Sequence, residues 1–388
     1  MLRADIVIKD ALHKLLQYVE AEDFNGYDPY DTLNSPLPFH WLGKLGPVLA
    51  IQFQKRNPVN IRPLLGVRKS RNPKAIGLFL RAYSTLYHSD PRPEYLQHMQ
   101  DLFQWLRDNP SKGYSAFCWG YDFPWASPVK YVDAYVPSVV ATGFVVKGLH
   151  EYYMATADSE VLPLVQGAAE FVLNHVDRHD DDNGVCFSYT PVMKDACYNA
   201  SLLGAEILAR YLALNEEVSK SVTPSRSPQA TVSRGDETAL RYGRPSLRSG
   251  RPTQGDEIAV LIEKAIDFVV ARQQPDGCWN YSVDLESGRE RVQIDFHQGY
   301  LIGSIEKIMR LTGIRNPEWE EALRKGLGYY RNEQFFDDGR SMWRIPMQWP
   351  VEIHNQSQGI ITFNMCDEHR DFAHTIAATL ARGGAVLV

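Results

Sequence analysis

A short phrase recurs along the chain and constrains its fold more than any other feature. In each of five segments, an amphipathic helical pattern is followed by a polar turn with Gly, then by aromatic residues, and then by a more apolar helical pattern. The five turns are AEDFNGYDPYD (21–31), NPSKGYSAFCWGYD (109–122), HDDDNGVCFSYTP (179–191), QPDGCWNYSVD (274–284) and FDDGRSMWRIP (336–346). Such self-similarity predicts one large domain assembled from repeated helical units.

The spacing of the aromatic residues supports a regular repeat. Phe187 follows Trp119 by 68 residues, and Trp343 follows Trp279 by 64 residues. The interval from Phe187 to Trp279 is longer, at 92 residues, because it contains 219–255, a stretch rich in Ser, Arg, Gly and Pro. That composition cannot bury enough apolar surface to order a chain. We therefore expect 219–255 to be a disordered insertion that the fold does not need.

Apolar residues spaced at i, i+3 and i+4 predict twelve helices. The expected ranges are 4–22, 40–55, 72–88, 91–108, 134–156, 159–177, 195–215, 256–273, 296–312, 317–333, 354–364 and 368–383. The segments 159–177 and 256–273 are amphipathic, whereas 134–156 and 195–215 are apolar on more than one face, as inner helices are. This alternation predicts an all-α (α/α)6 toroid, a ring of helical hairpins forming a single domain over 1–388, with short β-hairpin-like loops at one mouth.

The recurring phrase has a structural interpretation. In the turn at 274–284, Gly277 can adopt the left-handed conformation that ends a helix. Trp279 can pack over the helix end, and the side chain of Gln273 can satisfy backbone groups that the helix leaves free. We interpret the phrase as a joint between an outer helix and the next inner helix. Such a joint can contribute residues to a functional site only where it lies at the mouth of the ring.

Composition excludes several classes of function. The 388 residues carry a net charge of -6, which leaves no basic footprint for nucleic acid. The five cysteines contain no C-x-x-C pair, so we expect neither a disulfide framework nor a structural zinc site. The N-terminus lacks the apolar core of a signal peptide, and no run approaches the ~18 apolar residues of a membrane span. We expect a cytoplasmic protein without a cofactor, a bound metal or an integral membrane segment.

Residues 264–279 read K-A-x2-F-V-x3-Q-x3-G-x-W and resemble the QW motif of the triterpene cyclases, whose domains are α/α barrels. The other four turns are QW-like, and 325–343 is the nearest of them. The chain has no D-x-D-D segment, which those cyclases use as the protonating acid, and DRHDDD at 177–182 has a different spacing. The resemblance implies the barrel architecture and leaves a terpenoid or prenyl cyclase as one alternative function.

A second resemblance covers nearly the whole chain. The segments FNGYDPYDTLNSP (24–36), NIRPLLGVRKSRNPKAIGLFLRAY (60–83) and FCWGYDFPW (117–125) look like a poorly characterised bacterial and archaeal family that is similar to six-hairpin glycosidase-like toroids. Its members occur in exopolysaccharide biosynthesis, which implies a polysaccharide or glycan intermediate as substrate and an exopolysaccharide assembly complex as partner. Some members carry the label delta-aminolevulinate dehydratase. Nothing in this sequence supports that label, because that enzyme is a β/α barrel with a Schiff-base lysine.

In a closed ring, polar residues that precede the inner helices meet at one mouth although they are far apart in sequence. The candidates for catalysis are Asp122, Asp133, Asp295, His297 and Tyr121. The candidates for substrate binding are Asp28, Asp31, Trp119, Trp125, Tyr135, Lys194, Tyr198, Asn199, Tyr281, Trp343, Trp349, Glu352 and His354. Carboxylates hydrogen-bond sugar hydroxyls and act as acid and base, and aromatic faces stack on the apolar face of a sugar ring.

Several of these residues also have a purely structural interpretation. Asp28 and Asp31 can form Asx turns around the intervening proline, and Asp133 can cap a helix. A single histidine is most often structural, although His297 aligns with His354 of the next repeat.

The candidates together favour a carbohydrate-active enzyme. A hydrolase would need two carboxylates across a cleft, taken from Asp122, Asp133 and Asp295. A lyase or uronate epimerase would need a Tyr or His base, namely Tyr121, Tyr135 or His297. The sequence does not choose between them, and a non-catalytic glycan-binding toroid is a further alternative.

Overall fold

The computed structural model describes residues 2–43, 45–57, 59–114, 116–126, 131–222 and 253–383. Its α-helices are α1 (Leu2–Ala21), α2 (Leu45–Arg56), α3 (Pro73–Ser89), α4 (Pro93–Asp108), α5 (Val139–Thr156), α6 (Val161–Asn174), α7 (Tyr198–Val222), α8 (Gln254–Val270), α9 (His297–Thr312), α10 (Pro317–Glu333), α11 (Ile353–Asn364) and α12 (Arg370–Ala381). Its strands are β1 (Trp125–Ala126), β2 (Tyr131–Val132), β3 (Arg178–Asp181), β4 (Gly184–Phe187), β5 (Ala196–Cys197), β6 (Ser282–Val283) and β7 (Glu290–Arg291).

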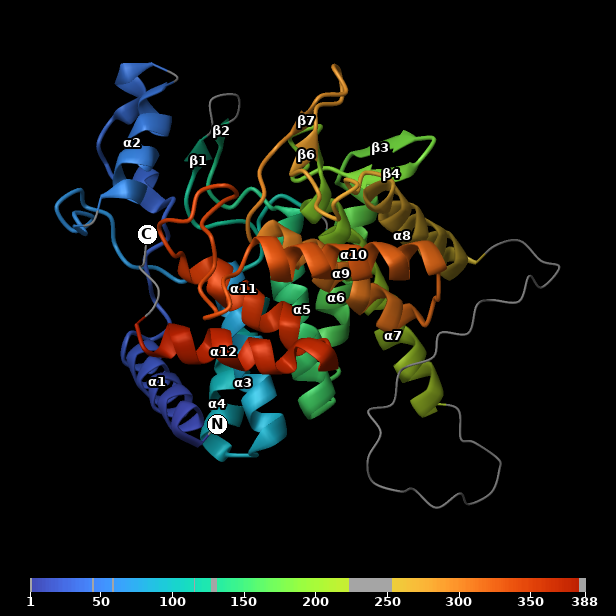
Figure 1. Ribbon diagram of the computed structural model, residues 1–388, viewed down its shortest axis with the longest axis horizontal. Helices are drawn as coiled ribbons and strands as arrows, with labels where there is room; N and C mark the ends of the chain where they lie inside the picture. Colours follow the sequence, from blue (N-terminus) through green and yellow to red (C-terminus); the bar gives the residue numbers. More distant parts are fainter. Residues whose placement is uncertain are drawn as a thin grey trace.

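The helices form an inner and an outer layer (Figure 1). The inner helices α3, α5, α7, α9 and α11 pack side by side in that order, and each is followed in the chain by an outer helix. The outer helices α1 and α12, at the two ends of the chain, pack against each other and complete the ring. This arrangement confirms the predicted all-α toroid.

Burial separates the two layers as the sequence predicts. In α5, every residue from Val139 to Val146 is buried, whereas the outer helix α4 buries only Met99, Leu102, Phe103 and Leu106. Small residues let the inner helices approach closely. A Cβ on Gly148 of α5 would lie 2.3 Å from the backbone oxygen of Gly77 on α3. A larger residue at Gly148 would therefore force the two helices apart.

The predicted joint is present at Gln273. Its side chain donates hydrogen bonds to the backbone oxygens of Gly277 (2.9 Å) and of Ala322 on α10 (2.8 Å). The indole N–H of Trp279 donates to the backbone oxygen of Val269 in the last turn of α8 (2.9 Å). Gly277 has φ +98°, a value that L-residues rarely adopt, and a Cβ there would lie 2.5 Å from a backbone oxygen of α10. The joint therefore connects the end of α8 to α10, the next outer helix.

The same construction occurs two repeats earlier in the sequence, at Trp119. The indole N–H of Trp119 donates to the backbone oxygen of Leu106 at the end of α4 (3.1 Å). Its backbone N–H donates to Thr142 on the following inner helix (3.0 Å), as that of Trp279 does to Gln298 (2.9 Å). Trp119 is thus a buried structural residue of the joint, and not part of a surface that a substrate could reach.

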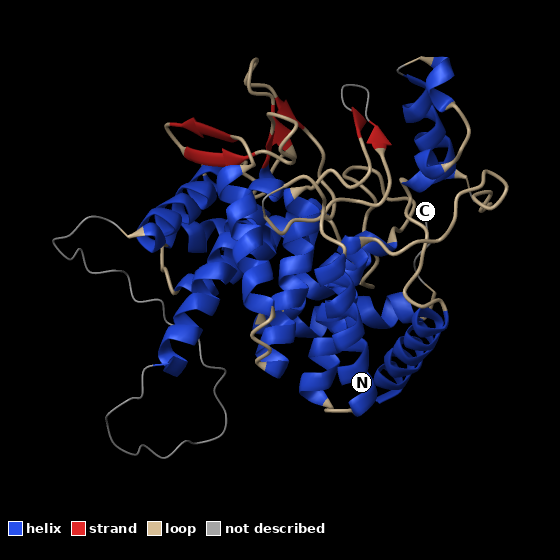
Figure 2. Ribbon diagram, turned by 180° about the vertical axis from the view of Figure 1, so that it is seen from behind, coloured by secondary structure: helices blue, strands red, loops and turns tan. Residues whose placement is uncertain are grey.

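The strands lie together at one end of the ring (Figures 1 and 2). β1 pairs with β2, β3 pairs with β4, and β5, β6 and β7 form a three-stranded sheet, all antiparallel. These hairpins belong to the loops that precede α5, α7 and α9. We call this end of the ring, where the inner helices begin, the mouth.

Most helices differ from the predicted ranges by a few residues, and two of the differences concern the mouth. The inner helix expected at 134–156 begins at Val139, because Ser138 caps it by accepting the N–H of Ala141. The helix expected at 40–55 is α2, which packs on β1 and on two short 3-10 segments, Asp31–Asn34 and Phe39–Leu42. It stands beside the mouth, apart from the ring (Figures 1 and 2).

Most of the predicted insertion at 219–255 falls outside the described residues. Residues 219–222 belong to the end of α7, and 254–255 begin α8. Thr253 caps α8 with a capping box formed with Asp256. The single domain over 1–388 and the dispensable insertion remain predictions.

Candidate functional site

At the mouth, helix α9 begins with an imidazole held by a carboxylate. The Nδ1 atom of His297 lies 2.5 Å from Oδ1 of Asp295, and Gln293 donates to the other oxygen at 3.0 Å. Burial opposes ionisation of Asp295, but the His297 imidazole and these hydrogen bonds outweigh burial and lower the carboxyl pKa. Asp295 is therefore ionised at neutral pH. It accepts the Nδ1 proton of His297, which leaves Nε2 as the basic atom of the ring.

A second imidazole comes from the first turn of α11. The Nε2 atom of His354 is hydrogen-bonded to the hydroxyl of Tyr300 on α9. Burial, and then the positive charge of Lys74, lower the pKa of His354 well below its ordinary value, so the ring is neutral at pH 7. Burial also raises the pKa of Tyr300, so its hydroxyl keeps a proton that it can donate to Nε2. The proton of the neutral imidazole then lies on Nδ1, which becomes an acidic position.

The ring of Phe296 separates the two imidazoles. Its centroid lies 4.2 Å from that of His297 and 3.8 Å from that of His354, and both pairs are stacked. Two rings cannot share one face at these separations, so the imidazoles lie on opposite faces of Phe296. No described residue hydrogen-bonds Nε2 of His297 or Nδ1 of His354, and neither atom is among the buried polar atoms without a partner. The mouth therefore offers one basic and one acidic ring nitrogen.

A carboxyl group with a raised pKa lies in the loop between α1 and α2. Asp28 accepts the backbone N–H of Tyr30 at 2.9 Å, which is the Asx turn that the sequence allows. Burial raises the pKa of Asp28 to about 6, and the neighbouring carboxyl groups of Asp31 and Asp122 also raise it, whereas the cation of Lys74 lowers it. The carboxyl group of Asp28 thus interacts with the charge of Lys74 in the first turn of α3.

We predict that Asp28→Asn makes the protein more stable above pH 6. An ordinary aspartate has a pKa of 3.8, against about 6 for Asp28 in the fold. Between these values the folded state binds more protons than the unfolded state, so stability falls as pH rises. The loss approaches about 3 kcal/mol, at about 1.4 kcal/mol for each pKa unit. Asn cannot ionise, so denaturant unfolding at pH 4 and pH 8 should show a smaller fall for the variant.

The control for this prediction is Asp10→Asn, which removes an exposed carboxylate of α1 that pairs with Lys14. It should leave the dependence of stability on pH unchanged. If Asp28→Asn and the wild type lose the same stability between the two pH values, the carboxyl group of Asp28 is not protonated in the fold near pH 5.

Three tyrosines and a tryptophan line the same end of the ring. The hydroxyls of Tyr121 and Tyr189 lie 3.2 Å apart, and the ring of Tyr189 contacts Trp125 edge-on at 5.9 Å. Burial raises the pKa of Tyr121, which favours the protonated hydroxyl and makes it a hydrogen-bond donor rather than a base. Tyr281 contacts His297 edge-on at 4.8 Å. These rings supply flat apolar surface next to polar groups.

Asp122 lies in the loop between α4 and α5. It is buried, accepts a hydrogen bond from the hydroxyl of Ser70, and has a second oxygen without a hydrogen-bond partner. Burial raises its pKa above the ordinary value. Its backbone oxygen accepts from Asn34 at 3.4 Å. The carboxyl group thus connects the segment before α3 to the aromatic hairpin that holds Tyr121.

The segment before α11 carries three predicted residues. Burial raises the pKa of Glu352, the residue that precedes α11, and the charge of Asp295 adds to this effect, which places Glu352 near the imidazoles. The backbone oxygen of Trp343 accepts from Asn355 at 3.2 Å. Trp349 is 61% exposed, and the guanidinium of Arg340 lies 5.7 Å from its ring.

Other predicted residues are not brought to the imidazole pair. Asp31 is buried in an ion pair with Arg62 (2.7 Å) and accepts the backbone N–H of Asp28, so it holds the loop together. Asp133 and Lys194 are exposed. Asp133 precedes α5 by six positions and does not cap it.

Three further predicted residues have structural partners. Tyr135 is 60% exposed with φ +63°, and its backbone N–H donates to Tyr121 at 2.7 Å. Tyr198 is buried with its hydroxyl bonded to Glu290. Asn199 is buried and accepts the thiol of Cys197 at 2.9 Å.

The residues predicted from the sequence do not include Lys74, Phe296 or Tyr300. Each carries a signal that could have identified it. Lys74 is a charge in the first turn of a helix whose other residues are mostly apolar, and Tyr300 lies three positions after His297, on the same face of α9. Phe296 stands between two predicted residues.

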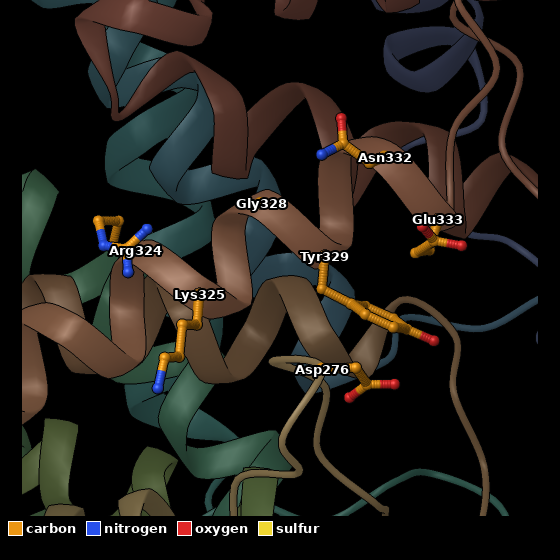
Figure 3. A pocket seen from close by; sticks show the side chains of 7 residues that line it. All are labelled: Asp276, Arg324, Lys325, Gly328, Tyr329, Asn332 and Glu333. Carbon is orange, nitrogen blue, oxygen red and sulfur yellow. The ribbon is translucent and has the colours of Figure 1, made fainter.

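A hollow of about 540 Å³ lies on the outer surface of the ring, away from the mouth (Figure 3). Arg324, Lys325 and Tyr329 of α10 line it, together with Asp276 from the preceding joint. It is lined by the surface of an outer helix and shares no residue with the mouth. We therefore do not place the functional site there.

Metal binding and membrane insertion find no support in the described part of the chain. No group of three or more His, Cys, Asp or Glu side chains is arranged there to hold a metal ion. Among the helices that the structure describes, none combines the length and apolar character that a membrane crossing requires.

Comparison with known proteins relates the chain to others by structure and not by sequence. No protein-family model and no curated protein sequence matches it. Cellobiose 2-epimerase from Bacillus thermoamylovorans superposes with a TM-score of 0.54 at 14% identity, over 80% of this chain and 75% of that one. Cellobiose 2-epimerase from Spirochaeta thermophila superposes with a TM-score of 0.51 at 9% identity, over 92% of this chain and 88% of that one. The family 76 α-mannanase of Bacteroides thetaiotaomicron superposes with a TM-score of 0.50 at 14% identity, over 79% of this chain and 72% of that one.

Proposed function

We propose that this protein is a carbohydrate-active enzyme that epimerises a reducing sugar by proton transfer at the carbon next to its carbonyl group. The observation that carries the proposal is the imidazole pair, with a basic Nε2 on His297 and an acidic Nδ1 on His354. Its fold is shared with proteins whose names include a sugar epimerase and a glycosidase, which supports a glycan substrate by analogy only.

The reaction needs two groups on opposite sides of one carbon. With the sugar ring open, Nε2 of His297 takes the C2 proton, and the electron pair moves through C1 to the carbonyl oxygen, which gives an enediolate. The Nδ1–H of His354 then returns a proton to C2 on the other face while the Tyr300 hydroxyl gives its proton to Nε2, so the imidazole stays neutral and the carbonyl re-forms. The proton held by His297 returns to Tyr300 through solvent. The two imidazoles exchange roles in the reverse direction. Lys74 is the nearby cation that can stabilise the negative oxygen.

The aromatic surroundings fit a sugar. Tyr281 beside His297 and Trp125 beside Tyr189 present flat surfaces for the apolar faces of sugar rings. A terpenoid cyclase would need a dry, acid-poor cavity, and the charged and hydrogen-bonding groups at this mouth weigh against it.

Glycoside hydrolysis is a second candidate, favoured by Asp28. A carboxyl group with a pKa of about 6 is suited to be a general acid. The partner carboxylate would be Asp295 or Glu352. Hydrolysis and epimerisation give different products, so one assay separates them.

The test is proton NMR of the wild-type protein with reducing disaccharides, cellobiose among them, in D2O. We expect deuterium at C2 and a new C2 epimer, with the glycosidic bond intact. The double variant His297→Asn/His354→Asn controls for contaminating activity and should give neither product. Release of monosaccharides would support the hydrolase. Binding of disaccharides without exchange or cleavage would support a non-catalytic glycan-binding toroid and contradict epimerisation.

The cytoplasmic location and the association with an exopolysaccharide assembly complex are also proposals. The location is predicted from the charged N-terminal segment and the lack of a long apolar run, whereas the association comes from the sequence resemblance alone. Co-purification of the tagged protein with polysaccharide-assembly components would test the association.

A further inference from the structure

Past the first turn of the inner helices, the ring encloses a small cavity of about 30 Å³. Tyr300 and Phe144 line the end of it that is nearer the mouth, since both belong to the first two turns of their helices. The remaining wall is strongly cationic. Arg81, Lys147, Arg210 and Lys307 line the cavity, against a single carboxylate, Glu206.

The carboxylate of Glu206 is fully engaged with its own partners. It accepts from Lys147 at 2.9 Å, from Arg210 at 2.9 Å and from Ser304 at 2.8 Å. Burial opposes its ionisation, but Lys147 and Arg210 outweigh burial and lower its pKa to about 2. Glu206 therefore neutralises one positive charge and has little capacity left for the others.

The rest of the cationic wall lacks comparable partners, namely one nitrogen of Arg210 and the side chains of Arg81 and Lys307. Arg210 is 1% exposed, yet its Nη1 makes no hydrogen bond, and the carboxylate of Glu151 lies 3.8 Å from that nitrogen. Among the described residues, neither Arg81 nor Lys307 has an ion-pair partner within 4.0 Å. Counting Glu151 and Glu206, four cations face two carboxylates, an excess of two positive charges.

We propose that this cavity is a binding site for a small inorganic anion of about the size of chloride. Buried charges in proteins are normally paired, whereas the buried Nη1 of Arg210, a residue that lines the cavity, has no hydrogen-bond partner. The space accommodates one or two water-sized species, which suits a monatomic anion better than a larger oxyanion or a sugar acid.

The pKa values of three of the cations in this cavity are lowered, as expected where positive charges lack a compensating negative charge. Burial lowers the pKa of Lys147 to about 8, and it also lowers the pKa values of Lys307 and Arg81, while Arg210 acts in the same direction on all three. His150 is buried, neither ring nitrogen has a hydrogen-bond partner, and burial lowers its pKa and keeps the ring neutral. It is also close enough to Arg210, Lys307 and Arg81 for their charges to lower its pKa. An anion in the cavity would favour the protonated lysines.

Thermal unfolding at constant ionic strength tests the site. Sodium chloride is exchanged stepwise for sodium isethionate, whose bulky anion cannot enter, and the melting temperature is recorded. A ligand that binds only the folded state stabilises it in proportion to the logarithm of its concentration above Kd, so the melting temperature should rise with chloride. Crystals soaked in bromide should show an anomalous peak between Arg81, Arg210 and Lys307.

Substitution of one unpaired cation gives the mutational test. Lys307→Gln should weaken chloride binding roughly tenfold or more, because it removes one nearby charge. If the Lys307→Gln variant does not fold, Arg81→Gln gives the same test. Arg310→Gln, one turn further along α9 in a surface pair with Glu306, should bind chloride as the wild type does. A melting temperature that does not respond to chloride, or a bromide-soaked crystal with an empty cavity, would overturn the proposal.

Discussion

The His354→Asn variant should stop interconverting the two sugar epimers while it still exchanges the C2 proton of one of them. The remaining base, Nε2 of His297 held by Asp295, can remove the proton that faces it and return a solvent deuteron to the same face. The opposite face lacks its acid, so the second epimer does not form. We expect the rate of epimerisation to fall by roughly 10²–10⁴, the usual contribution of a general acid or base.

The His297→Asn variant should show the mirror image of this behaviour. It should exchange only the other epimer, through the tautomer of His354 that carries its proton on Nε2 and leaves Nδ1 free to act as the base. Interconversion should be lost to a similar extent. Proton NMR in D2O, started from each epimer separately, measures both exchange and interconversion in one experiment. The opposite selectivity of the two variants is the signature of two groups acting on opposite faces of one carbon.

The control for both variants is His88→Asn, an exposed histidine in the last turn of α3. It should retain wild-type exchange and interconversion. If both active-site variants exchange the two epimers equally, a single group serves both faces, and the assignment of acid and base to separate imidazoles is wrong.

The architecture was predictable because the repeated joint is a local feature. Gln273, Gly277 and Trp279 lie within seven residues of each other, and their hydrogen bonds mostly join backbone groups of the same segment. A period of such joints then determines that helices alternate between layers. The exception was α2, whose sequence forms a helix but whose apolar residues Leu45, Leu49 and Phe53 remain exposed.

The site was predictable only in part, because it depends on contacts between distant segments. Asp295 and His297 were identified from their position at the start of an inner helix, and His354 from its alignment with the next repeat. Their roles depend on partners such as Tyr300, and on the position of Phe296 between the imidazoles, which no spacing rule reveals. In the same way, Trp119 and Tyr198 matched an aromatic platform by residue type but are buried structural residues.

The Trp279→Ala variant should be destabilised by about 3–5 kcal/mol, the cost usual for removing a large aromatic side chain from a core. Trp279 is fully buried, and its indole packs against Gly326 of α10, where an added Cβ would lie 2.4 Å from the ring. The substitution also leaves the backbone oxygen of Val269 without its indole donor. Urea or guanidinium unfolding followed by circular dichroism measures the loss.

The matched control is Trp349→Ala, which removes the same side chain from an exposed position (61%) in the loop before α11. It should change the free energy of unfolding by no more than about 0.5 kcal/mol. A loss of less than about 1 kcal/mol for Trp279→Ala would mean that the ring can close around the missing indole. In that case the recurring aromatic residue is not what holds successive hairpins together, and the repeat would need another physical cause.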